Sequence, residues 1–218
     1  MEHPFSVGAR VRKLGCLLLH KQAADELRFS SATANQTLTV YAADTGLERV
    51  TIGTGTGATA TSTATTALSI NASAAPNSLT ISGNYGINTI IGTGLADTLN
   101  GNRGNDIVTG GLGADTFRFD STLNATTNKD TITDFTVAQA DKIQLENAIF
   151  TALTTTGVLN ANAFVIGTAA TTAAQRIIYN STSGTLTYDS NGSAAGGATV
   201  FAQLATGLAL TASMFNVT

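Results

Sequence analysis

The chain of 218 residues contains one cysteine, no tryptophan, two prolines and only 11% charged residues. Its single cysteine, Cys16, excludes an internal disulfide framework. No apolar run approaches the roughly 20 residues that a membrane-spanning helix requires. The sequence is instead rich in Thr, Ala, Gly and Asn, a composition that suits short strands joined by tight polar turns.

The net charge is -3, and most acidic residues follow residue 50. Residues 51–218 hold five Lys and Arg against nine Asp and Glu, and they form no basic patch. Nucleic acid is therefore not an expected partner, because binding it requires clustered positive charge. The acidic residues are spaced rather than clumped, which favours metal binding over an acidic tail.

Residues 1–30 differ in composition from the rest of the chain. They contain both histidines, the only cysteine and a basic cluster followed by the apolar segment Leu14–Leu19. Two interpretations stand, a secretory signal peptide or a poorly ordered leader. We favour the leader, because the apolar segment is short and His20 and Lys21 follow it. The histidines lack a third partner at ligand spacing, so they do not predict a metal site.

Residues 31–82 contain four short segments in which apolar and polar residues alternate. In Thr37–Tyr41, Leu38 and Val40 fall on one face of an extended chain. The other three segments are Arg49–Ile52, Ala67–Ile70 and Leu79–Ile81. We expect β-rich, degenerate solenoid-like coils here. The Gly, Thr and Ala stretch from 53 to 66 is either a disordered loop or a degenerate turn.

Residues 83–118 divide into four units of nine residues: GNYGINTII, GTGLADTLN, GNRGNDIVT and GGLGADTFR. The first position of every unit is Gly, and the fourth is Gly except in the second unit, where it is Leu95. The sixth position is Asn or Asp, and the eighth is always apolar. Such a fixed register is the sequence signature of a repeat architecture.

Each unit is expected to form a six-residue turn and a three-residue strand, so that two units complete one coil. The Gly positions suit turns that need positive φ angles and a close approach of neighbouring chains. The eighth-position residues should point inward into a thin apolar core. These residues are Ile90, Leu99, Val108 and Phe117.

The sixth-position residues predict calcium binding. Neighbouring coils of a sheet lie ~4.8 Å apart, about twice the distance that separates calcium from an oxygen ligand. One ion therefore fits between two carboxylates one coil apart, with backbone carbonyls of the glycine-rich turns completing its six to eight ligands. On this reasoning Asp97 pairs with Asp115, and Asn88 pairs with Asp106. One such residue alone would merely form an Asx turn, but the fixed register favours the metal for Asp97, Asp106 and Asp115, while for Asn88 both interpretations stay open.

The pattern resembles the glycine-rich nonapeptide of RTX proteins, the hemolysin-type calcium-binding repeat. The resemblance continues through Asp115–Phe119 and Lys129–Phe135 to Asp141–Leu145, as in the segment that follows the repeats of RTX exports. It implies that a carboxylate beyond the repeats closes the last calcium turn, and Asp130 and Asp134 are the matching positions. As surface-turn residues these two need no metal, and that alternative stays open. The expected Ca2+ ligands are thus Asn88, Asp97, Asp106, Asp115, Asp130 and Asp134, with backbone oxygens of Gly101, Gly104, Gly110, Gly111 and Gly113.

Residues 146–218 hold little charge and predict a small β-rich region with short helices. Arg176–Asn180, Thr185–Asp189 and Thr199–Leu204 predict an antiparallel meander, and Asn147–Leu153 predicts a short helix. Asp189–Gly192 is similar to the start of an EF-hand loop, but it lacks the later ligands and favours a hairpin turn. The uncharged tail at 208–215 resembles the C-terminal signal that the type I secretion apparatus recognises.

These segments together predict a mostly all-β chain. We expect a poorly ordered leader at 1–30, solenoid-like coils at 31–82, a parallel calcium-binding β-roll (a β-solenoid) with its cap at 83–145, and a C-terminal β-rich region at 146–218. No His-Glu-x-x-His motif, Gly-x-Ser-x-Gly motif or triad histidine is present, so we expect no enzyme activity.

The expected function is that of a calcium-binding module in a secreted, extracellular bacterial protein, folding after type I export. Two alternatives stay open. One is the C-terminal part of an RTX protease or lipase whose catalytic domain precedes residue 1. The other is a cell-surface structural protein, such as an adhesin, a surface-layer subunit or an ice-binding solenoid.

Overall fold

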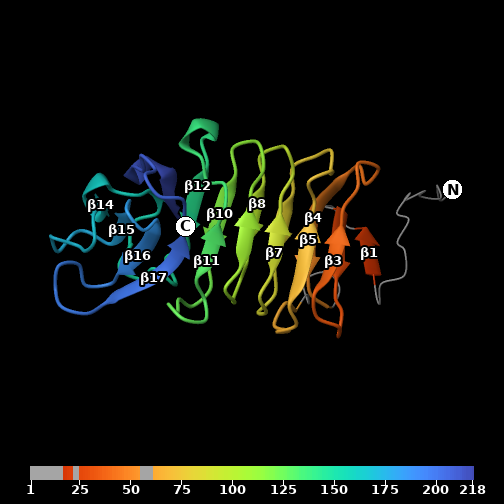
Figure 1. Ribbon diagram of the computed structural model, residues 1–218, viewed down its shortest axis with the longest axis horizontal. Coiled ribbons are helices and arrows are strands. Elements are labelled where there is room, and N and C mark those ends of the chain that lie inside the picture. Colours follow the sequence, from red (N-terminus) through yellow and green to blue (C-terminus); the bar gives the residue numbers. More distant parts are fainter. Residues whose placement is uncertain (1–16, 22–24, 55–60) are drawn as a thin grey trace.

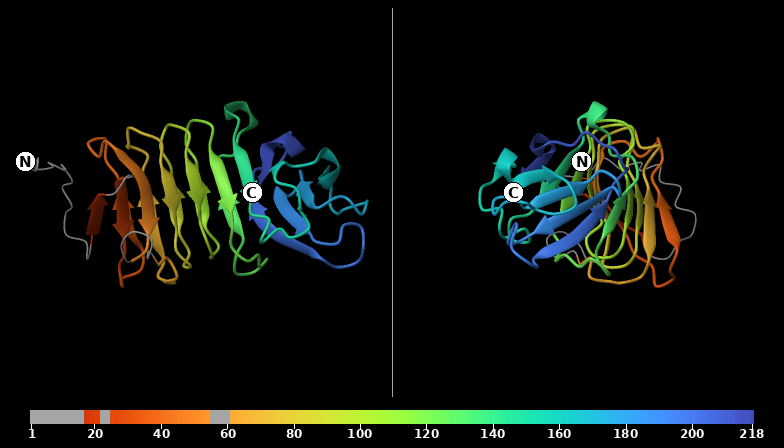
Figure 2. Two further views of the ribbon diagram at one scale, coloured as in Figure 1. Left: turned by 180° about the vertical axis from the view of Figure 1, so that it is seen from behind. Right: turned by 60° about the vertical axis from the view of Figure 1, so that its left-hand side comes forward.

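The computed structural model describes residues 17–21, 25–54 and 61–218. Between residues 25 and 145 consecutive strands alternate between two nine-stranded sheets, so this part of the chain winds into a stack of coils (Figure 1). The stack is elongated along the direction in which the coils succeed one another, and Figure 2 shows it from behind and obliquely. The predicted parallel β-roll is confirmed.

The strands of each sheet are given in spatial order. Sheet A contains β1 (Leu17–Lys21), β2 (Asp25–Phe29), β4 (Leu47–Ile52), β6 (Thr80–Ser82), β8 (Thr98–Asn100), β10 (Thr116–Phe119), β12 (Lys142–Leu145), β18 (Phe215–Val217) and β13 (Gly157–Val158). Sheet B contains β14 (Phe164–Ile166), β15 (Ile177–Asn180), β16 (Thr185–Asp189), β17 (Ala198–Gln203), β11 (Asp130–Ile132), β9 (Ile107–Thr109), β7 (Thr89–Ile91), β5 (Leu68–Asn71) and β3 (Gln36–Thr39). The short 3-10 helices are η2 (Val137–Gln139), η3 (Ala161–Ala163) and η4 (Ala212–Met214).

The apolar eighth-position residues of the repeats stack in two inward ladders, as the sequence predicts. All members of both ladders pair with their neighbours in parallel register, and those of sheet A are at most 2% exposed. The sheet A ladder is Ile81, Leu99, Phe117, Ile143 and Phe215. The sheet B ladder is Leu38, Ile70, Ile90, Val108 and Ile132. Both ladders run beyond the repeats, so the repeats share one continuous core with the coils on either side.

The N-terminal boundary differs from the one that the sequence predicts. Residues 25–29, assigned above to a poorly ordered leader, form β2 and pair in parallel with β4. The reason is the alternation in this segment, which buries Leu27 and Phe29 in the core. Strand β1 then adds antiparallel to β2. Residues 1–16, with His3 and Cys16, lie outside the described residues, as do residues 55–60 of the Thr-rich stretch.

The C-terminal region continues both sheets of the roll. The predicted meander is present as β15, β16 and β17. Strand β17 also pairs in parallel with β11, and β18 pairs in parallel with β12. Residues 147–153 form hydrogen-bonded turns rather than the predicted helix. Three threonines and Gly157 follow at once, and these residues are poor at extending a helix.

An aromatic cluster joins the last coil of the roll to the C-terminal region. The ring of Phe201, on β17, packs edge-on against Phe119 of β10 and against Phe150, with centroids 5.0 and 5.2 Å apart. Phe150 packs in the same way against Tyr188, whose hydroxyl accepts the N–H of Ala152 at 2.7 Å. Aromatic contacts of this kind stabilise beyond the area that they bury.

Replacing Phe201 by Ala should therefore lower the free energy of unfolding by about 3–5 kcal/mol, because Phe201 is almost fully buried and its loss leaves a cavity. The matched control is Val158→Ala on β13, where the side chain is 66% exposed and the change should stay within about 0.5 kcal/mol. Denaturant unfolding in the presence of calcium measures both values. Equal effects would contradict a shared core between roll and C-terminal region.

Candidate functional site

The turns of the repeats line the two long edges of the roll (Figure 1). The first edge holds turns 83–88, 101–106 and 120–129, which lead from sheet A to sheet B. The second edge holds turns 92–97, 110–115 and 133–141, which lead from sheet B to sheet A. Each turn of the repeats ends at its sixth position, so these side chains stack at the two edges.

On the first edge the sixth-position residues form a hydrogen-bonded ladder. The backbone N–H of Asn88 donates to Asp106 Oδ1 at 2.7 Å, and the N–H of Asp106 donates to Asp130 Oδ1 at 3.1 Å. Each carboxylate therefore lies against the backbone of the preceding coil. The structure brings Asn88 and Asp106 together, as the spacing predicts, and it adds Asp130 to the same edge.

The second edge carries a matching ladder of three aspartates. The N–H of Leu79 donates to Asp97 Oδ1 at 2.7 Å, and the N–H of Asp97 donates to Asp115 Oδ1 at 2.9 Å. The N–H of Asp115 then donates to Asp141 Oδ1 at 3.0 Å. Sequence reasoning did not place Asp141 in the site. Its signal was the pattern of Asp141–Leu145, which alternates like Asp115–Phe119 in the last repeat.

Two carboxylate oxygens in these ladders are buried and have no hydrogen-bond partner. They are Oδ2 of Asp106 and Oδ2 of Asp115. Both residues are 1% exposed, so solvent does not replace the missing donor. A buried carboxylate oxygen without a donor is costly, and a cation is one of the few groups that can offset that cost.

The glycines of the repeats leave room for these oxygens. A Cβ at Gly101 would lie 2.2 Å from Asp106 Oδ2, and a Cβ at Gly110 would lie 2.3 Å from Asp115 Oδ2. A Cβ at Gly92 would meet the carbonyl oxygen of Gly110 at 2.3 Å and Asp97 Oδ2 at 2.6 Å. Carboxylate and carbonyl oxygens therefore face positions that only glycine leaves open. An oxygen-rich cradle of this kind fits calcium, a hard cation with oxygen ligands.

Burial raises the pKa values of the edge carboxyl groups. Burial, followed by the negative charge of Asp130, raises the pKa of Asp106. Burial also raises the pKa of Asp130. The pKa of Asp115 rises to about 7, chiefly through burial and then through the charges of neighbouring aspartates. At neutral pH these edges therefore favour a proton or a cation over bare negative charge.

Asp134 lies on the second edge but uses both carboxylate oxygens on backbone groups. Oδ1 accepts the N–H of Gly110 at 2.9 Å, and Oδ2 accepts the N–H of Gly111 at 2.8 Å. Asp134 thus holds the backbone of the last repeat turn, and it differs in this from Asp115, which keeps a free oxygen. The structure thus places Asp134 against the last repeat turn, and its role as a calcium ligand stays a prediction.

In the described part of the chain, no three His, Cys, Asp or Glu side chains gather around one point. Carbonyl oxygens and water would therefore supply most ligands of an ion at these edges. Calcium accepts such a set, because it takes six to eight oxygens in flexible geometry.

Comparison with known families agrees with this geometry. Residues 82–117 match the family of the RTX calcium-binding nonapeptide repeat, in four copies. The chain carries four RTX repeats. RTX repeats of the hemolysin type bind Ca2+, and the repeat is a calcium-binding element rather than a catalytic one. No curated protein and no solved structure matches the chain. None of the helices in the described segments is long and apolar enough to cross a membrane.

Replacing Gly111 by Ala should destabilise the protein by more than about 1–3 kcal/mol, the usual cost of a strained backbone. Gly111 has φ +108°, and a Cβ there would lie 2.0 Å from the Thr93 carbonyl oxygen of the neighbouring turn. The matched control is Gly94→Ala, because a Cβ at Gly94 meets nothing within 4 Å. Thermal unfolding with saturating calcium compares the two variants, and similar melting temperatures would contradict the close stacking of the turns.

The stability of the calcium-free protein should fall as the pH rises from about 5 to about 8. The pKa of Asp115 in the folded state is raised from 3.8 to about 7, so the folded chain holds this proton more tightly than the unfolded chain. The resulting stabilisation is complete below the unfolded pKa and is lost as the pH rises through 7. Asp106 and Asp130 act in the same direction. Far-UV circular dichroism in chelator at several pH values measures the trend as a loss of β-structure with rising pH, which a gain of β-structure with pH would contradict.

Proposed function

We propose that this chain is a calcium-dependent folding module of a secreted protein. The observation that carries the proposal is the pair of buried, unpartnered oxygens on Asp106 and Asp115, which lie in turns of RTX repeats. The ladders at the two edges place further carboxylates one coil away from each of them. Bound calcium supplies the positive charge that these edges otherwise lack.

Without calcium, the residues of the repeats oppose folding in two ways. Asp106 and Asp130 are buried side by side on one edge, and Asp115 lies between Asp97 and Asp141 on the other, so like charges repel. The glycine-rich turns also lose much backbone entropy when they order. A ligand that binds only the folded chain converts its binding free energy into folding free energy.

We propose further that the chain leaves a bacterial cell through a type I secretion apparatus while unfolded, and folds outside, where calcium is abundant. The support is the resemblance of the C-terminal tail to type I export signals. In the folded chain Phe215, the last residue of this tail, and Val217 just after it are 1% exposed, within β18 of sheet A. An apparatus that reads this tail would therefore need the chain unfolded.

The test is far-UV circular dichroism of the full chain in chelator, followed by calcium titration. We expect a gain of β-structure with calcium and little gain with magnesium, which is smaller and demands octahedral geometry. The variant that combines Asp106→Ala with Asp115→Ala should lose the calcium response, because both free carboxylate oxygens are gone.

The matched control is Glu48→Ala, which removes an exposed carboxylate of β4 outside the repeats and should respond to calcium like the natural chain. A spectrum that does not change with millimolar calcium would remove the proposal. An unaltered response in the double variant would remove the role given to the two turns.

A further inference from the structure

The four repeat turns differ in where the N–H of their second position points. In the first repeat, the N–H of Asn84 donates to Asn88 Oδ1 of the same turn at 2.8 Å. In the second repeat, the N–H of Thr93 donates to Asp97 Oδ2 at 2.6 Å. Each of these turns is closed by its own sixth-position side chain. We call turns 83–88 and 92–97 the closed turns.

The third and fourth repeats direct the same N–H out of the turn. The N–H of Asn102 donates to Asn100 Oδ1 at 2.8 Å, and the N–H of Gly111 donates to Asp134 Oδ2 at 2.8 Å. The sixth-position carboxylate of each turn loses its internal donor, and its Oδ2 atom is left without a partner. We call turns 101–106 and 110–115 the open turns.

The two kinds of turn differ in backbone conformation. In the open turns, the second and fourth positions lie in the left-handed region: Asn102 has φ 69°, Gly104 123°, Gly111 108° and Gly113 114°. In the closed turns, which the structure describes completely, neither position has a positive φ. Thr93 and Leu95 occupy these positions in the second repeat, and their side chains disfavour left-handed φ angles.

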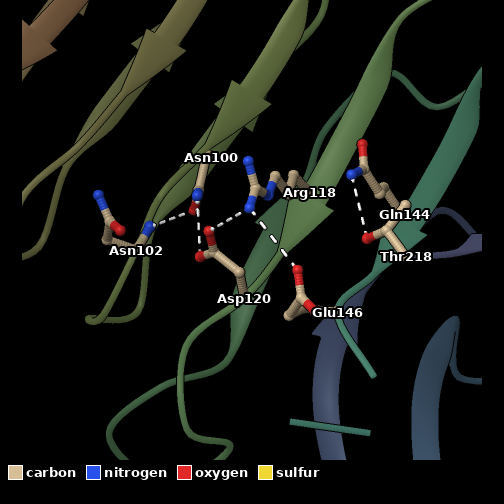
Figure 3. A network of polar contacts seen from close by, with 7 residues as sticks. All are labelled: Asn100, Asn102, Arg118, Asp120, Gln144, Glu146 and Thr218. Atoms are coloured by element: carbon tan, nitrogen blue, oxygen red, sulfur yellow. Dashed lines mark hydrogen bonds and ion pairs between the residues drawn. The ribbon is translucent and has the colours of Figure 1, made fainter. Parts of the chain in front are cut away.

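A polar network on the outer face of sheet A fixes the open turn of the first edge (Figure 3). Asn100 accepts the N–H of Asn102 and donates its Nδ2 to Asp120 Oδ1 at 2.9 Å. Arg118 lies between Asp120 and Glu146, at 3.2 and 3.8 Å from their carboxylate oxygens. The network therefore orients Asn100, and Asn100 keeps the second-position N–H away from Asp106.

We propose that the four repeats hold two calcium ions, one on each edge, in the open turns that end at Asp106 and Asp115. The closed turns take no ion. Asn100 and Asp134 are positioning residues, because each withdraws the second-position N–H and leaves an oxygen of the open turn free. This inference rests on the proposed calcium binding, and it assigns the ions to particular turns.

The closed turns have no oxygen to spare at their sixth positions. The carboxylate of Asp97 already accepts three hydrogen bonds, from the N–H of Leu79 and from the N–H and hydroxyl of Thr93. Asn88 carries no charge, and its Nδ2 donates to the Leu68 carbonyl and to Asn84 Oδ1. These two turns match the repeat in sequence, but hydrogen bonds from protein groups already satisfy their sixth-position side chains in place of an ion.

The ion count is measured by native mass spectrometry and by titration calorimetry of the full chain with calcium chloride. We expect two ions for the natural chain, and one ion for either Asp106→Asn or Asp115→Asn. The matched control is Asp97→Asn, the same change at the sixth position of a closed turn. It should keep two ions, with weaker binding on the second edge because a nearby charge is lost.

Double variants distinguish a positioning role from general destabilisation, because a positioning residue should affect the ion of one edge only. In the Asp115→Asn background one ion remains, at the turn that ends at Asp106, and adding Asn100→Ala should abolish its binding. In the Asp106→Asn background the remaining ion lies on the other edge, and adding Asn100→Ala should leave it bound. Asp134→Ala should abolish the remaining ion in the Asp106→Asn background and leave it bound in the Asp115→Asn background. Asn180→Ala serves as control, because Asn180 accepts the N–H groups of Thr182 and Ser183 in the hairpin between β15 and β16, away from both edges of the repeats. It should leave the ion count unchanged in every background.

The possible outcomes separate this inference from the proposed function. Three or four ions in the natural chain, or one ion lost in Asp97→Asn, would overturn the division into open and closed turns while leaving a calcium module. Equal losses from Asn100→Ala in both backgrounds would overturn the positioning roles. No calcium binding at all would overturn the proposed function as well. Two ions in the natural chain, with one ion lost in Asp106→Asn and one in Asp115→Asn, would support the inference.

Discussion

The structure depends on burying carboxylates in register at the two edges of the roll. A parallel β-roll repeats at ~4.8 Å, so any group at the sixth position meets its equivalent one coil away. Backbone N–H groups of the preceding coil stabilise one oxygen of each carboxylate, as at Asp106 and Asp115. The second oxygen remains, and in a protein interior its negative charge is strongly destabilising. The fold of the repeats is therefore tied to a proton or a metal ion.

The apolar core alone offers little against this cost. The three-residue strands of the repeats contribute one inward side chain each, such as Leu99 or Val108, so the core there is thin and its burial per residue is small. The coil just before the repeats does not bear the cost of buried carboxylates. Ile70 belongs to the sheet B ladder and Ile81 to the sheet A ladder, and the turn between these two residues carries no acidic residue. The charged edges are thus a local feature of the coils from 83 to 141. Stability in that stretch depends on its turns more than on its core.

The sequence predicted the parts of the site that obey the nine-residue period. The Gly positions, the inward eighth position and the pairing of Asp97 with Asp115 all follow from spacing alone. Asp141 was missed because the insertions at 120–129 and 133–141 stretch the coil, so its partner lies 26 residues away instead of 18. The orientation of one peptide group at each second position could not be predicted either. In the fourth repeat it depends on Asp134, 23 residues further along the chain, and in the third on Asn100, which is only two residues away but is held by Asp120.

The C-terminal strands complete the argument, because they attach to the same coils that carry the charge. The N–H of Thr131 donates to the Asp106 carbonyl, and the N–H of Lys142 donates to the Asp115 carbonyl. Strands β11 and β12, which begin at these bonds, are the ones on which β17 and β18 pair. The open turns thus lie one coil before the strands that receive the end of the chain. On the proposed function, neutralising the carboxylates of these turns would stabilise the coil on which β17 and β18 pair, so calcium binding and the ordering of the C-terminal strands would be coupled.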